Sequence, residues 1–118
     1  VNSGGDNISP QKVESILTIE PEIAQALVYG DKRPHLVAVL VPDQDWLARL
    51  RHDSISTESA LAPVLGKINK SLSNIEKVRR HIIADEPFTT DNGLLTATMK
   101  IRRHKIIDIY GKALNALY

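Results

Sequence analysis

The feature that most constrains the fold is an unbroken run of apolar side chains near the middle of the chain. Residues 36–41 read Leu-Val-Ala-Val-Leu-Val, and His35 precedes them. Valine, like other β-branched residues, favours extended backbone. A strand with one wet face would carry polar residues at every second position, so a strand that is apolar throughout must be covered on both faces. We therefore predict a central strand over residues 35–41 with other elements packed on both of its sides.

Two more strands and several helices are predicted around this one. Residues 23–29 are apolar and rich in strand formers, and the loop at 30–34 contains Gly and Pro, which favours a hairpin. A third strand is predicted at residues 81–84. Apolar residues at helical spacing predict helices at four places, namely from Pro10, over residues 44–51, from about residue 60, and from Ile101 to the end with Gly111 on its polar side. The predicted fold is α+β: a small three-stranded sheet with an antiparallel hairpin, packed by helices.

Length, composition and charge narrow the classes of function. A chain of 118 residues is long enough for one domain with a modest core. The lack of cysteine excludes disulfides and thiolate metal sites, and it makes the cytoplasm the expected compartment. No apolar run reaches about 18 residues, so no transmembrane segment is expected. Residues 1–59 hold five Lys and Arg against nine Asp and Glu, whereas residues 60–118 hold ten against five, which suits the second half to an anionic partner.

The first motif is a glycine segment near the beginning of the chain, Ser3-Gly4-Gly5-Asp6. It leads into a helix for which Ser9 is a good N-cap, with proline at the first helical position. A pair of glycines permits close backbone approach, but by itself it is equally compatible with an ordinary tight turn.

The second motif is residues 91–103, Asp-Asn-Gly-Leu-Leu-Thr-Ala-Thr-Met-Lys-Ile-Arg-Arg. Asn92 and Gly93 tolerate positive φ and predict a turn. The segment from Leu94 to Met99 is too short and too rich in threonine for a helix, which places Lys100 at the tip of a loop just ahead of the last helix. A lysine there is a mobile point charge that can reach a phosphate or carboxylate. On spacing alone, the solvated start of a surface helix is the simpler interpretation.

Together the two segments resemble two core motifs of the AMP-forming acyl-CoA synthetases, members of the adenylate-forming enzymes. The second segment resembles the tenth motif in the form seen in the long-chain fatty acid branch, although Met99 stands where acetyl-CoA synthetases and luciferases have Gly, and Ala97 where long-chain members often have Pro. The two motifs stand at opposite ends of the chain in the family's order. The first segment resembles the end of the eighth motif through Gly4, Gly5, Ile8, Pro10, Val13 and Glu14.

This resemblance implies that residues 1–118 form a single carboxy-terminal lid domain of a long-chain fatty acid CoA ligase, starting just after the hinge on which the lid turns. It implies that Lys100 is the catalytic lysine for formation of an acyl-adenylate from a fatty acid and ATP. The full-length enzyme is expected to need ATP, Mg²⁺ and CoA, whereas this chain alone is expected to bind none of them and to be inactive. Its obligatory partner is then the amino-terminal domain, which holds the substrate pockets.

The resemblance also assigns a role to the glycine segment. Ser3, Gly4, Gly5 and Asp6 are expected to leave room for the pantetheine arm of CoA during thioester formation, since glycine has no side chain to block it. The same small domain is thus expected to serve two half-reactions, with a rotation between them.

Two other classes of function remain open from the sequence. One is a non-catalytic interaction or regulatory module of the same fold. The other is a nucleic-acid-binding domain, suggested by Arg79, Arg80 and the basic last helix. Binders of single strands need aromatic stacking platforms, and the few aromatic residues here are not interleaved with the basic ones. We therefore expect no nucleic-acid partner, and a parent enzyme that is cytoplasmic or peripheral at a membrane.

Overall fold

The predicted central strand is β2 (Leu36–Pro42), and all of its residues are buried. The computed structural model describes residues 9–30 and 33–118, and the glycine segment, Ser3 to Asp6, lies outside them. Strand β1 (Ile23–Tyr29) pairs antiparallel with β2 as the predicted hairpin, and β3 (Val78–Ile83) pairs with β2 in parallel on the other side. The sheet order β1-β2-β3 therefore puts the most apolar strand in the middle.

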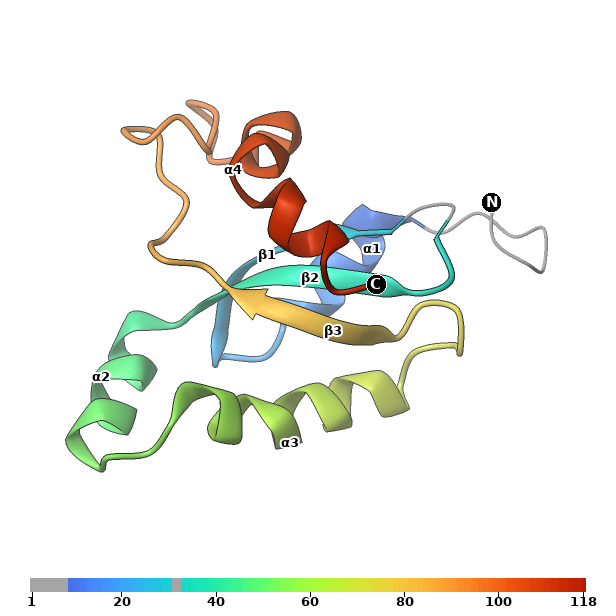
Figure 1. The fold of residues 1–118 in the computed structure, drawn as a ribbon. Coiled ribbons are helices and arrows are strands. Elements are labelled where there is room, and N and C mark those ends of the chain that lie inside the picture. The colour runs from blue at the N-terminus through green and yellow to red at the C-terminus, as the bar shows by residue number, and fades with distance from the viewer. Residues whose placement is uncertain (1–8, 31–32) are drawn as a thin grey trace.

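Layers cover both faces of this sheet, as the apolar run requires (Figure 1). Helices α1 (Pro10–Leu17) and α3 (Thr57–Lys70) pack on the face that carries Leu36, Ala38 and Leu40. Helix α4 (Arg103–Asn115) and the long segment before it pack on the face that carries Val37, Val39 and Val41. Successive side chains of a strand point to opposite faces, so β2 supplies both cores at once. Helix α2 (Gln44–His52) follows β2 and leads to α3.

Side chains cap the starts of α1 and α2, and the predicted N-cap Ser9 is one of them. Ser9 accepts a hydrogen bond from the Lys12 amide, and proline occupies the first turn of α1. Asp43 caps α2 through the Trp46 amide at 3.0 Å. Of the helices in residues 9–30 and 33–118, none is long and apolar enough to cross a membrane.

Several predicted boundaries are wrong. Strand β3 starts at Val78 rather than at residue 81. Arg79 and Arg80 are exposed within the strand, so its first half has no apolar pattern from which it could be predicted. Helix α3 begins at Thr57, since Ser56 caps it and its polar first turn carries no apolar signal. The last helix begins at Arg103 rather than at residue 101.

The orientation of the last helix also differs from the prediction. Gly111 is buried and not on the polar side, while Ile109 is 58% exposed. The helix lies on the sheet through Ile106, Tyr110 and Leu114, and the small Gly111 lies beside this row.

Candidate functional site

The Lys100 loop, which we define as residues 94–102, is a closed hairpin-like turn. Leu95 and Ile101 pair as an antiparallel bridge, and the Thr96 amide donates to the Lys100 carbonyl at 2.8 Å. The Lys100 amide donates in return to the Thr96 hydroxyl at 3.1 Å. At its base, the Arg102 amide donates to the Leu94 carbonyl at 2.8 Å. Lys100 is exposed, so the loop holds its backbone while leaving the side chain in solvent.

Met99 turns the chain immediately before the lysine. Its φ is 66°, in the left-handed region that glycine adopts at no steric cost. This conformation gives a physical reason for the glycine that some members of the resembled family carry directly before their lysine. The side chain of Met99 is 67% exposed next to Lys100.

A second set of bonds holds the segment that leads into the loop. The Gln25 side chain on β1 donates to the Phe88 carbonyl at 2.9 Å and accepts from the Phe88 amide at 2.8 Å. Phe88 itself is 2% exposed. Asn92 and Thr89 then bond each other's backbone at 3.0 Å, which closes the turn that Asn92 and Gly93 predict. Gly93 has the expected positive φ of 79°.

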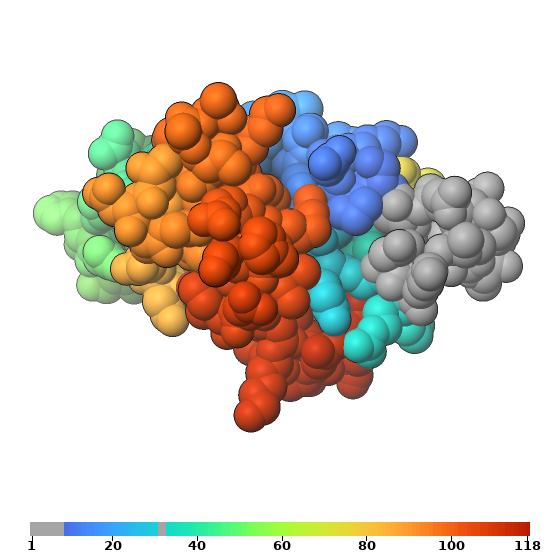
Figure 2. Space-filling view, turned by 90° about the horizontal axis from the view of Figure 1, so that it is seen from above, coloured from blue at the N-terminus to red at the C-terminus, as the bar shows by residue number. Residues whose placement is uncertain are grey.

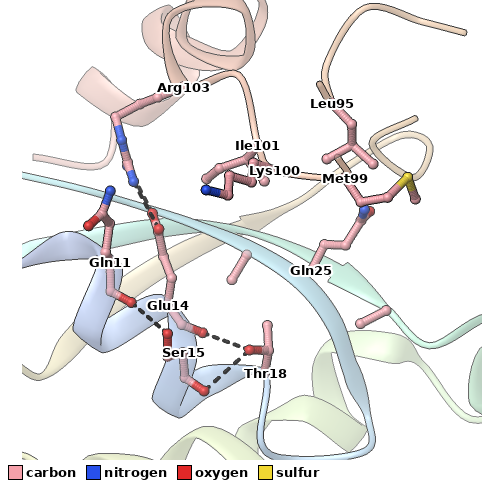
Figure 3. A pocket seen from close by; sticks show the side chains of 12 residues that line it. Gln11, Glu14, Ser15, Thr18, Gln25, Leu95, Met99, Lys100, Ile101 and Arg103 are labelled. Atoms are coloured by element: carbon pink, nitrogen blue, oxygen red, sulfur yellow. Dashed lines mark hydrogen bonds and ion pairs between the residues drawn. The ribbon is translucent and has the colours of Figure 1, made fainter. Parts of the chain in front are cut away.

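Helix α1 and the Lys100 loop, at opposite ends of the sequence, lie side by side at the surface (Figure 2). Between them is an open pocket of about 530 Å³. Figure 3 shows the amine of Lys100 turned toward this pocket. The pocket is lined by Gln11, Glu14, Ser15 and Thr18 of α1 and its end, Ala24, Gln25 and Ala26 of β1, and Leu95, Met99, Lys100, Ile101 and Arg103.

The pocket wall contains a partly buried ion pair. Arg103 donates from both terminal nitrogens to the two carboxylate oxygens of Glu14, each at 2.8 Å. Glu14 is 8% exposed. Since these two charges neutralise each other, Lys100 is the remaining charge among those lining residues that belong to 9–30 and 33–118. Within this part of the chain the pocket presents a cation, which suits an anionic group brought to it from outside.

No metal-ligand set is found in the part of the chain that the structure describes, where no three His, Asp or Glu residues come together. The exposed lysine on a bonded loop has the placement that the resemblance requires. Its catalytic role, and the role of Ser3, Gly4, Gly5 and Asp6, remain predictions at this point.

The pairing of Arg103 is not indicated by the sequence. The spacing predicts the solvated start of a surface helix in this region, whereas the guanidinium is held by Glu14, 89 positions away in sequence. Glu14 was singled out only as part of a motif match. No local pattern could have joined them, because the pairing depends on how α1 and α4 come together around the sheet.

The family model described as the AMP-binding enzyme C-terminal domain matches residues 1–118. The chain belongs to this family. Membership confirms the resemblance to adenylate-forming enzymes, and the observed α+β fold agrees with it.

Relatives of this AMP-binding enzyme C-terminal domain are adenylate-forming ligases and reductases. The chain is 34% identical over its whole length to 16% of a chloroplastic long-chain-fatty-acid–[acyl-carrier-protein] ligase of Arabidopsis thaliana. It is 29% identical over its whole length to 22% of a long-chain-fatty-acid–CoA ligase of Mycobacterium tuberculosis. In the AMP complex of the A-PCP didomain of a Segniliparus rugosus carboxylic acid reductase, the matching part has a TM-score of 0.83 and 37% identity, covering 98% of this chain and 16% of that one. The chain thus spans about a fifth or less of these relatives.

Proposed function

We propose that residues 1–118 are the mobile carboxy-terminal lid of a longer AMP-forming ligase that activates long-chain fatty acids with ATP and Mg²⁺ and transfers them to CoA. Its partner is the amino-terminal domain of the same enzyme. The observation that carries the proposal is an exposed Lys100 on a bonded loop, beside a pocket in which the other charged residues that the structure describes are paired. Such a group can be delivered to a site built by another domain. Cytoplasmic residence stays a prediction.

In this proposal Lys100 acts in the first half-reaction. A fatty acid carboxylate attacks the α-phosphate of ATP, the bond to pyrophosphate breaks, and an acyl-adenylate forms. Negative charge is concentrated where the two anions meet, so an ammonium placed there stabilises the transition state more than the separated reactants. The bonded backbone of the Lys100 loop supports this role, because a pre-positioned charge needs no rearrangement when the reaction occurs.

The second half-reaction is assigned to the other end of the lid. After rotation about the hinge, Ser3, Gly4, Gly5 and Asp6 line the passage for a pantetheine arm whose thiol attacks the acyl carbon and releases AMP. Helix α1, which follows the glycine segment in sequence, begins at Pro10 and lines the same pocket as Lys100. We propose that rotation of the lid exchanges the lysine for the glycine segment between the two half-reactions.

A second candidate is an acyl carrier protein in place of CoA as the acceptor. The relatives with 34% and 37% identity are named an acyl-carrier-protein ligase and a carboxylic acid reductase, compared with 29% and 33% for the CoA ligases of M. tuberculosis and Cavia porcellus. Both acceptors present a thiol on a pantetheine arm, so the lid chemistry is the same. Supplying CoA or a pantetheinylated carrier protein to the pre-formed acyl-adenylate distinguishes them by which thioester forms.

The experiment that tests the lid function is Lys100→Ala in the longer enzyme. Pyrophosphate release from fatty acid and ATP is expected to slow by about 100- to 1,000-fold, the usual effect of removing one transition-state charge partner. Thioester formation from a supplied acyl-adenylate is expected to be nearly unchanged. Lys105→Ala removes an exposed cation of the same helix region and serves as the matched control.

Loss of both half-reactions in Lys100→Ala would contradict the division of labour between the two ends of the lid. Unchanged pyrophosphate release would favour a non-catalytic module of the same fold. The nucleic-acid alternative predicts a salt-dependent mobility shift with single-stranded DNA or RNA, which we do not expect.

A further inference from the structure

The Glu14–Arg103 pair joins helices that lie on opposite faces of the sheet. Helix α1 packs with the cluster that contains Leu36 and Ala38, and α4 packs with the cluster that contains Val37 and Val39. Their side chains meet beside β1, which is an edge strand in the order β1-β2-β3. The pair therefore links α1 to α4 past the edge of the sheet. Figure 3 shows the pair beside Lys100 in the pocket wall.

The pair also completes the hydrogen bonding of this edge. The Val28 amide donates to a Glu14 carboxylate oxygen at 2.7 Å, and the Val28 carbonyl accepts from Arg103 at 3.2 Å. Glu14 thus supplies the acceptor and Arg103 the donor that a neighbouring strand would otherwise supply to the backbone of Val28. With the two bonds between Glu14 and Arg103, four charge-assisted bonds connect α1, β1 and α4.

The start of α4 depends on this connection more than the start of α1 does. The N-cap of α1 is a serine that bonds the Lys12 amide, and Val13 and Leu17 are fully buried. The N-cap of α4 is Arg102, which makes no side-chain cap bond. The first fully buried residue of α4 is Ile106, one turn later. In the first turn of α4, Arg103 therefore supplies the side-chain bonds to α1 and β1.

Lys100 stands only three residues before Arg103. The intervening chain is short and partly fixed, because Ile101 pairs with Leu95 and the Arg102 amide bonds the Leu94 carbonyl. A displacement of the first turn of α4 is therefore transmitted to the loop. We propose that Glu14 and Arg103 are positioning residues for adenylation, because their bidentate pair around the edge of β1 holds the Lys100 loop at a set place beside α1. This proposal rests on the function proposed above for Lys100.

The test uses single-turnover pyrophosphate release by the longer enzyme, with variants Arg103→Lys, Arg103→Gln, Glu14→Gln and the double variant. We expect kcat for adenylation to fall by about 10- to 100-fold in Arg103→Gln, the scale of a displacement of about 1 Å. KM for the fatty acid is expected to stay constant, since the lid does not form the acyl pocket. Arg103→Lys is expected to lose less, because an ammonium keeps the charge without the two-pronged geometry.

Two results separate positioning from a general loss of stability. The double variant Glu14→Gln with Arg103→Gln is expected to be no slower than the slower single variant, since both remove one interaction. Leu65→Ala removes a buried side chain from the core on the α3 side, away from the loop, and is expected to lower the melting temperature without changing kcat. Lys67→Met, which breaks an exposed pair with Glu20 at 3.1 Å, is the ion-pair control and is expected to leave both unchanged.

The outcomes for the two proposals are distinct. If Lys100→Ala does not slow adenylation, the function proposed for the lid is wrong whatever Arg103 does. If Lys100→Ala slows adenylation while Arg103→Gln and Glu14→Gln behave like Leu65→Ala, the pair is structural only and the positioning role is wrong. Arg103→Lys keeps this comparison possible if Arg103→Gln fails to fold.

Discussion

The segment that leads to the Lys100 loop is bonded to the sheet near Phe88 through the Gln25 side chain. This residue lies on β1 and makes two hydrogen bonds with the backbone of Phe88, at 2.8 and 2.9 Å. Each neutral bond contributes about 1 kcal/mol net, and a buried backbone group left without a partner costs about 1 to 3 kcal/mol. Gln25→Ala removes both bonds beside a phenylalanine that is 2% exposed. We therefore expect the free energy of unfolding to fall by about 2 to 4 kcal/mol.

Urea unfolding of the 118-residue chain measures this change, with the fluorescence of Trp46, the sole tryptophan, as the signal. Hydrogen exchange at the Phe88 amide is expected to speed up at the same time, because its acceptor is lost. Gln44→Ala is the matched control. The Gln44 side chain makes one bond, to the Pro42 carbonyl at 3.1 Å, at an exposed position.

We expect Gln44→Ala to change the free energy of unfolding by no more than about 0.5 kcal/mol. A similarly small effect of Gln25→Ala, with the denaturant slope unchanged, would refute the reasoning. The segment around Phe88 would then be held by apolar packing alone.

Two further predictions concern the Lys100 loop and the pH dependence of stability. Met99→Gly relieves a left-handed conformation that costs a residue with a side chain about 1 to 2 kcal/mol, but glycine also gives the unfolded chain more freedom. We therefore expect the free energy of unfolding in urea to rise by about 0.5 kcal/mol. A fall would mean that Met99 does not keep its positive φ. The Ser73 hydroxyl and the Lys12 ammonium hold the pKa of Glu76 below its ordinary value of 4.5. Glu76 therefore stabilises the fold at a pH above its unfolded pKa, and this stabilisation is lost as the pH falls through its pKa in the folded state. The small difference in free energy of unfolding between the unsubstituted chain and Glu76→Gln should shrink between about pH 5 and pH 3 and not stay constant.

Much of the architecture could be predicted because it depends on local signals. The apolar run that forms β2 predicts by itself that both faces of the sheet are covered. Its hairpin partner β1 has the predicted bounds, Ile23–Tyr29. The caps at Ser9 and Asp43 act on amides within three residues. The Lys100 loop follows from a turn signal and a run too short for a helix. Family membership was also recognisable, because both motifs are contiguous in sequence.

Elements without a clean local pattern were placed wrongly. Arg79 and Arg80 interrupt the apolar alternation of β3, and they are tolerated because β3 is an edge strand. The orientation of α4 was also misjudged at Gly111. Apolar spacing gives a helical stripe but not its rotation on the sheet, which is decided by how Ile106 and Tyr110 fit against β2.

The sequence by itself determined the central strand, the hairpin, the helix caps and an accessible lysine ahead of the last helix. Only the tertiary structure decided which charged side chains pair with one another. Arg103 and Glu14 look like ordinary surface residues in sequence, and they become a bidentate pair because α1 and α4 reach around the same sheet edge from opposite faces. The physical reason is that a bond between residues 89 positions apart depends on the packing of two layers against one sheet, and no local pattern records that packing.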